Sequence, residues 1–263
     1  MSTKHYTVPF TYERILTQDA ARLGHKIPHI ITLGEVDVTA LRGQIRAYRR
    51  KSKKQLSLST YLLYCYVRTL EEFKYAQGYK GWINKVTVFN DIDVLFPVEL
   101  KNKTLEPKII RAANRKAIDE LEIEISQAKE KQSATISTAK KIFLKFPRVC
   151  RDLFYRIILR TPTLRKDTFG TTLFSSPSFL ADAENSGKHV KAFGVSLPVQ
   201  SIGICLGNKY PKLIKENDQL LEKEFISFAI QGDHSIVDGA ELGRFMSRFV
   251  HLSSTLIKTF IDE

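Results

Sequence analysis

The spacing of hydrophobic and polar positions predicts helices alternating with strands from the first residues onward. Residues 11–24 form a short helical pattern that Gly24 ends. Residues 27–38 then predict a strand, and residues 39–54 a basic helix. Residues 56–73 carry apolar side chains on nearly all sides behind a Ser or Thr N-cap, which predicts a well-buried helix.

The rest of the chain continues this alternation up to a last helix. The predicted elements are strands over 86–100 and 106–113, a helix over 114–125, a long basic helix over 139–166, a strand over 169–179, two strands within 193–207, a hairpin of 208–217 with 220–230, a turn at 232–233 and a helix from about residue 238. Strands and helices in this order predict an α/β fold with one sheet.

Composition limits the class of protein. The 263 residues are 43% hydrophobic, which suits one large domain or two small ones and excludes a disordered chain. There is no apolar signal core at the N-terminus, and no apolar run approaches the ~18 residues of a membrane span. Cys65, Cys150 and Cys205 lie far apart and form no metal-binding spacing, so we expect buried thiols in the cytoplasm and no metal site.

The net charge of +13 favours anionic partners such as nucleic acid, anionic membranes or phosphorylated ligands. No helix-turn-helix, zinc-finger or RNA-recognition motif accompanies the charge, so we expect no nucleic-acid partner. A basic surface that only keeps the protein soluble is the alternative.

Residues 139–166 form the most unusual segment. They hold nine Lys or Arg against one acid, Asp152, with large apolar residues between the charges, and Pro147 should break the helix. A basic amphipathic helix of this kind can lie on an anionic membrane or against a partner. We expect instead that its apolar face packs on the domain and that its arginines face water, as in most surface helices.

The strongest candidate for chemistry is His234, at the junction of the last predicted strand and helix. An ordinary imidazole has a pKa near ~6.5 and can therefore accept and return a proton at neutral pH. Asp238 is placed to cap the following helix, and Gly239 permits close backbone approach. A capped helix with an incidental exposed histidine remains the alternative.

This His-x-x-x-Asp-Gly segment, with Ala240 to Phe245 behind it, resembles the active-site segment of dihydrolipoyl acyltransferases, the cores of 2-oxo acid dehydrogenase complexes. It also resembles chloramphenicol acetyltransferase, which shares their fold. The resemblance continues at the Ile-Pro-His strand that begins at Ile27, and at Phe169-Gly-Thr-Thr-Leu-Phe-Ser175. Ser235 departs from the family pattern, in which an arginine stands at that position.

The resemblance implies a role for four residues. His234 would be the general base, and Ser175 would donate a hydrogen bond to the transition-state oxyanion. Asp238 would be structural and would pair with Arg14, which matches the family's arginine thirteen residues before Ile27. His29 is more simply a packed histidine on an apolar strand.

The resemblance also implies a fold and an assembly. We expect a single catalytic domain over residues 1–263 with the chloramphenicol acetyltransferase-like fold, a mixed sheet flanked by helices in an α/β two-layer arrangement. The assembly would be a homotrimer with the active site between subunits, where His234 meets Ser175 of the neighbour. The reaction would move an acyl group between acyl-CoA and a thiol, hydroxyl or amine.

The sequence shows no lipoyl domain and no subunit-binding domain. We therefore expect no covalently bound lipoyl group, and an acceptor that is either a separate acyl carrier or a small molecule. The alternative from another functional class is a non-catalytic trimeric scaffold whose basic segment at 139–166 binds a membrane or an acidic partner.

Overall fold

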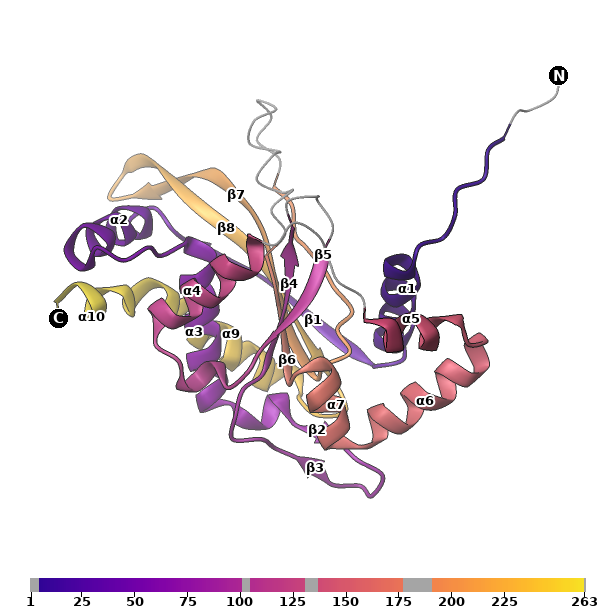
Figure 1. Ribbon diagram of the computed structural model, residues 1–263. Coiled ribbons are helices and arrows are strands. Elements are labelled where there is room, and N and C mark those ends of the chain that lie inside the picture. Colours follow the sequence, from indigo (N-terminus) through magenta and orange to yellow (C-terminus); the bar gives the residue numbers. More distant parts are fainter. Residues whose placement is uncertain (1–4, 101–104, 131–136, 177–190, 263) are drawn as a thin grey trace.

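A six-stranded mixed sheet forms the centre of the molecule, with helices packed against one face (Figure 1). The computed structural model describes residues 5–100, 105–130, 137–176 and 191–262. The strands lie in the order β1 (His29–Asp37), β8 (Gln219–Asp233), β7 (Ile202–Glu216), β6 (Thr172–Ser175), β4 (Val94–Glu99) and β5 (Leu105–Ile110). β4 with β6 and β6 with β7 run parallel, while the other pairs are antiparallel. The predicted α/β class and mixed sheet are confirmed.

Two helices, α3 (Leu58–Glu72) and α9 (Gly239–Thr255), fill the main core beside the sheet. Tyr66 of α3 is fully buried, and its ring contacts Phe174 of β6 and Phe245 and Phe249 of α9. Its hydroxyl forms a hydrogen bond with the Thr172 hydroxyl, so the one polar atom of this ring keeps a partner. The well-buried helix predicted for residues 56–73 is therefore confirmed.

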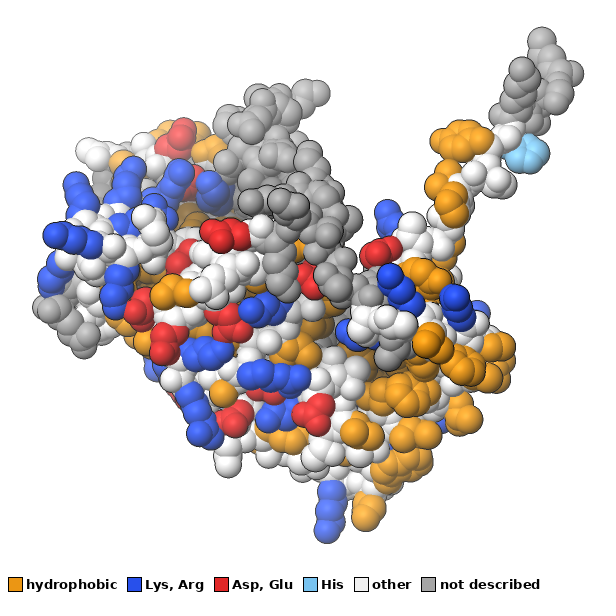
Figure 2. Space-filling view, viewed as in Figure 1, with side chains coloured by type: hydrophobic (Ala, Val, Ile, Leu, Met, Phe, Trp, Pro, Cys, Tyr) orange, Lys and Arg blue, Asp and Glu red, His pale blue; other side chains and the backbone are white. Residues whose placement is uncertain are grey.

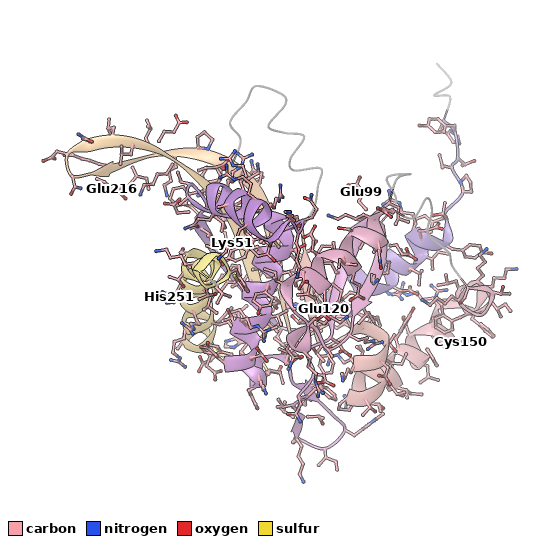
Figure 3. All side chains as sticks on the ribbon, turned by 60° about the vertical axis from the view of Figure 1, so that its left-hand side comes forward. Lys51, Glu99, Glu120, Cys150, Glu216 and His251 are labelled. Atoms are coloured by element: carbon pink, nitrogen blue, oxygen red, sulfur yellow. The ribbon has the colours of Figure 1, made fainter. Side chains whose placement is uncertain are left out.

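The remaining small elements surround this core. They are α2 (Leu41–Ser52), the 3-10 turns η1 (Lys74–Gln77) and η2 (Ala113–Arg115), the short pair β2 (Tyr79–Lys80) and β3 (Val86–Thr87), α4 (Ile118–Lys129) and α10 (Ile257–Asp262). The β7–β8 hairpin extends beyond the sheet, and Glu216 lies close to its tip (Figure 3). This hairpin was predicted, although β7 begins earlier, at Ile202.

Residues 193–197 do not form the strand that their apolar character predicted. No regular element lies between residues 191 and 201. Both edges of β7 are already paired, with β6 and with β8, so no edge beside it is free for another strand. The segment instead crosses the second face of the sheet, where a Cβ added at Gly194 would meet the Cys205 sulfur.

Four helices form a second cluster beside the sheet: α1 (Tyr12–His25), α5 (Thr138–Lys145), α6 (Arg148–Arg160) and α7 (Pro162–Phe169) (Figure 1). Pro147 is the N-cap residue of α6, so the break predicted at this proline is confirmed. A small apolar core of Leu23, Tyr155, Ile158 and Val199 joins the cluster.

The packing predicted for residues 139–166 is confirmed only in part, because α6 buries Tyr155 and Ile158 but also an arginine. The side of α6 that faces α1 carries Arg151, which is 8% exposed, whereas Leu153 is 60% exposed. Arg151 donates from Nε and Nη2 to the two carboxylate oxygens of Asp19, at 2.9 and 3.2 Å. Asp19 is itself buried on α1, and a buried carboxylate needs a charged partner, so the arginine turns inward and much of the apolar face turns outward.

Candidate active site

His234 follows the last residue of β8 and is exposed. Its backbone N–H donates to the Pro28 carbonyl over 2.8 Å, which ties the turn to the start of β1. Its Nδ1 lies 3.1 Å from the Val237 carbonyl oxygen. Because a carbonyl can only accept, Nδ1 carries the proton in this contact, and in the neutral ring Nε2 keeps its lone pair. The turn thus holds the imidazole in the tautomer that a general base requires.

Asp238 is the N-cap of α9. Its carboxylate accepts from the Glu241 N–H at 2.7 Å, and the Glu241 carboxylate accepts from the Asp238 N–H at 3.2 Å. This capping box fixes the start of the helix directly behind the histidine turn. Asp238 therefore acts locally, through the backbone.

Arg14 does not pair with Asp238 in this chain. Its side chain is exposed in the first turn of α1. Its backbone N–H donates to the Thr11 hydroxyl over 3.4 Å. Among the described residues no ion pair joins the two side chains, because α1 stands in the separate helical cluster. The ion pair expected between Arg14 and Asp238 is therefore not found within this chain. The role of Arg14 in the reaction stays a prediction.

Ser175 is the last residue of β6 and is half-buried. Phe174 points into the core below α3, so Ser175, one residue on, points to the opposite face of the sheet. There it pairs in register with Cys205 of β7. Burial raises the pKa of the Cys205 thiol, and a hydrogen bond with Ser175 partly opposes that rise.

Within one chain Ser175 and His234 lie far apart. Ser175 is in register with Cys205, which is in register with Ala229 of β8. His234 lies five residues beyond Ala229, and at ~3.3 Å per residue this places it roughly 16 Å along the strand direction from Ser175. The two side chains therefore cannot act on the same carbonyl inside a single chain.

The stretch of β8 between them carries polar residues that the sequence analysis did not select. Gln231 is fully buried, and its Oε1 accepts from the Ser196 hydroxyl at 3.2 Å. It shares the second face of the sheet with Ser227 and Asp233, whereas Phe228 and Ile230 face α9. The alternation of polar with apolar residues along 227–233 is the signal that could have identified them.

His29 packs where it was expected to, at the start of β1. Its Nε2 lies 3.1 Å from the Pro198 carbonyl oxygen, and it is in register with Asp233. Burial lowers the pKa of His29, with a smaller opposing effect of the hydrogen bond to Pro198. The residue therefore braces the segment that crosses the sheet.

No group of three or more His, Cys, Asp or Glu side chains suited to a metal ion occurs in the described ranges. None of the helices resolved in those ranges is long and apolar enough to cross a membrane.

Comparison with known proteins gives a family match over residues 4–141, slightly more than half of the chain. The matching description is "2-oxoacid dehydrogenases acyltransferase (catalytic domain)". No curated protein matches the chain significantly in sequence.

Solved structures share the fold at low sequence identity. A probable dihydrolipoamide acetyltransferase from Listeria monocytogenes is 16% identical, with a TM-score of 0.68 and 96% of each chain covered. The dihydrolipoamide acetyltransferase of Azotobacter vinelandii is 15% identical, with a TM-score of 0.70 over 96% of this chain and 93% of that one. A chloramphenicol acetyltransferase is 13% identical, with a TM-score of 0.50 over 89% and 93%. The chloramphenicol acetyltransferase-like fold is thereby confirmed.

Proposed function

The chain belongs to the family of 2-oxoacid dehydrogenase acyltransferase catalytic domains, and we propose that it transfers an acyl group between acyl-CoA and a thiol, hydroxyl or amine with His234 as general base. The observation that carries this proposal is the hydrogen bond of His234 Nδ1 to the Val237 carbonyl. In the neutral ring this contact places the proton on Nδ1 and leaves Nε2, with its lone pair, as the proton acceptor.

The proposed reaction uses this lone pair. Nε2 takes the proton of the acceptor as the acceptor attacks the thioester carbonyl, forming a tetrahedral oxyanion. Collapse of the oxyanion breaks the carbon–sulfur bond, and Nε2 returns its proton to the departing CoA thiolate. The contact at Nδ1 keeps the ring oriented through both transfers.

The oxyanion would be stabilised by the Ser175 hydroxyl of a second chain. The single chain separates Ser175 from His234 by roughly 16 Å along the strand direction. A homotrimer, in which the histidine end of one sheet faces the serine end of the neighbouring sheet, removes this obstacle. Removing one such donor typically lowers the rate by about 10²–10³.

The Azotobacter vinelandii enzyme offers a parallel. The work on that protein concerned the role of a serine, a histidine and an asparagine four positions after the histidine in its catalytic mechanism. Asp238 stands at the same spacing after His234 in this chain. We assign Asp238 a positioning role here, because its carboxylate holds the start of α9.

The acceptor would be a small molecule or a group on a separate acyl carrier. The similar structures include the cubic core of a pyruvate dehydrogenase multienzyme complex and a truncated 2-oxoacid dehydrogenase core from Thermoplasma acidophilum. A carrier protein that receives the acyl group from acyl-CoA at the trimer is the arrangement we propose for this chain, in the cytoplasm.

Substitution of His234 tests the general base. We expect His234→Ala to abolish acyl transfer from a panel of acyl-CoAs to thiol, hydroxyl and amine acceptors, with an unchanged melting temperature. His251→Ala is the matched control, because His251 is an exposed histidine of α9 away from the turn (Figure 3). Full activity of His234→Ala would defeat the proposal.

Mixing of two inactive variants tests the shared site. His234→Ala chains keep Ser175, and Ser175→Ala chains keep His234, so mixed trimers of the two would regenerate complete sites between chains. We expect co-expressed variants to regain activity above that of either variant alone. If trimers shown to contain both variants gain no activity, Ser175 and His234 do not act together in one site between chains.

A second candidate function, contact with an anionic membrane, follows from the exposed face of α6. Val149 and Leu153 are 79% and 60% exposed, and Phe154 lies beside them. Figure 2 shows hydrophobic side chains gathered over this part of the molecule. Exposed Arg148 and Arg156 on the same helix would face the lipid phosphates. Charge complementarity therefore favours a lipid surface over a second basic chain.

Vesicle sedimentation tests this contact. We expect the protein to sediment with vesicles containing phosphatidylserine and not with pure phosphatidylcholine, and Leu153→Ser/Phe154→Ser to lose the effect. Leu213→Ser/Leu220→Ser is the control, because both leucines are exposed on the β7–β8 hairpin. Equal loss in both variants, or no sedimentation of the wild type, would contradict membrane contact through α6.

A further inference from the structure

A pocket of about 380 Å³ lies where the C-terminal ends of α1 and α6 meet α7 and the end of β8. Its walls contain four basic side chains, which are Lys26, Arg156, Arg160 and Arg165. Leu23 and Leu159 supply an apolar part of the wall. A cavity of this size can hold a small molecule, and its largely charged lining with an apolar patch favours a charged ligand with an apolar part.

Arg165 is the unusual member of this set, because it is only 6% exposed. Its guanidinium stacks 4.0 Å above the centre of the Tyr79 ring, and Nη2 donates to the Val199 carbonyl. Nε has no hydrogen-bond partner. Across the described ranges no carboxylate forms an ion pair with this guanidinium. Asp233 attracts the guanidinium without a direct ion pair, so the buried charge is only partly compensated and the pocket favours a negative ligand.

The two acids of the pocket do not neutralise it. Asp152 accepts from Arg22 at 2.8 Å and lies 3.5 Å from Arg148 Nε, so its charge is already matched. Asp233 accepts from the Ser235 N–H at 2.9 Å. Burial lowers the pKa of Arg165, and the attraction of Asp233 opposes this only in part. Four cations stand against two carboxylates, and Asp152 is already matched by arginines outside the lining, so the pocket keeps a net positive charge.

We propose that this pocket binds a small anionic ligand, a phosphate ester or a carboxylate with a short apolar tail. Arg165 holds the anionic group at the base of the pocket, Arg156 and Arg160 close around it at the exposed mouth, and the leucine side chains contact the tail.

The position of the pocket links it to the histidine turn. Asp233 directly precedes His234, and Ile27 of the pocket precedes Pro28, whose carbonyl accepts from the His234 N–H. A ligand in the pocket would thus contact the backbone that carries the proposed base. The binding itself does not depend on acyl transfer, so it can be measured whether or not the protein is active.

Calorimetric titration of the full-length protein with three probes tests the site: hexyl phosphate, hexanoate and inorganic phosphate, all at constant ionic strength. We expect saturable binding at one site per chain, with the hexyl probes tighter than inorganic phosphate because of the apolar wall. Preference for hexyl phosphate would identify a phosphate ester as the ligand class, and preference for hexanoate a carboxylate.

Three variants assign the binding to this pocket. Arg156→Gln/Arg160→Gln changes two exposed residues and should weaken binding about tenfold or more, the effect of losing charge-assisted hydrogen bonds. Arg46→Gln/Arg50→Gln removes two exposed arginines of α2 and should leave binding unchanged. Arg165→Gln should abolish saturation, with its folded state checked by thermal melting.

Two outcomes would overturn the proposal. One is the absence of saturable binding with all three probes. The other is equal weakening in the α2 and α6 variants, which would show a general response to net charge. If Arg165→Gln fails to fold, the comparison of Arg156→Gln/Arg160→Gln with Arg46→Gln/Arg50→Gln still shows whether the probes bind in this pocket.

Discussion

The helices α9 and α6 are both amphipathic, but α9 buries mainly large apolar side chains, whereas α6 buries an arginine among them. α9 buries Leu242, Phe245 and Phe249 against the sheet and α3, as its pattern predicts. α6 buries Arg151 together with Tyr155 and Ile158, and it exposes Leu153. An amphipathic pattern therefore predicts the helix itself. The side chains of the element on which the helix packs decide which of its side chains are buried.

The difference arises from what each helix packs on. α9 packs on a sheet face of Ile226, Phe228 and Ile230, which can only be covered by apolar groups. α6 packs beside α1, whose inner side carries the buried carboxylate of Asp19. An unpaired carboxylate there would cost more than the apolar area that α6 leaves in water, so the ion pair determines the orientation.

Truncation of one leucine in each helix, Leu242 in α9 and Leu153 in α6, tests this comparison with the largest expected effect. We expect Leu242→Ala in α9 to lower the free energy of unfolding by about 2–5 kcal/mol, because it leaves a cavity in the core. Leu153→Ala in α6 should change it by no more than about 0.5 kcal/mol, as at other exposed positions. Urea denaturation followed by circular dichroism measures both. Equal losses would mean that the α6 face is covered.

Removal of the inward arginine should have an intermediate effect. We expect Arg151→Met to destabilise the protein by about 2 kcal/mol, below the ~3–5 kcal/mol of a fully uncompensated buried charge, because Arg22 still contacts Asp19. Asp19→Leu/Arg151→Leu should recover most of the loss, since it removes both charges. Thermal melting of the two variants beside the wild type gives the comparison, and a double variant less stable than the single one would refute the explanation.

Loss of the α9 cap should cost less than loss of the inward arginine. Asp238→Ala removes the acceptor for the Glu241 N–H, and we expect a cost of about 1 kcal/mol, with Asp238→Asn retaining most of the stability. α6 has no side-chain cap, because Pro147 occupies its N-cap position. Denaturant midpoints measure the loss, and Ser254→Ala at the exposed end of α9 serves as the control.

The sequence alone determined the local elements of this protein and the position of its candidate base. The helices around 11–24, 56–73 and 239–255, the break at Pro147 and the strand–turn–helix at His234 follow from periodicity, caps and turn residues, which act over a few positions. The resemblance of the same segments to a known family also indicated the overall fold correctly.

Only the tertiary structure decided how these elements use their side chains. The inward turn of Arg151 depends on Asp19, 132 positions away, and no local pattern reports such a partner. The separation of Ser175 from His234 depends on the register of β6, β7 and β8, which is set by pairing between distant segments. Short-range propensity fixes what each segment becomes, whereas long-range contacts between buried charges and paired strands fix what it faces.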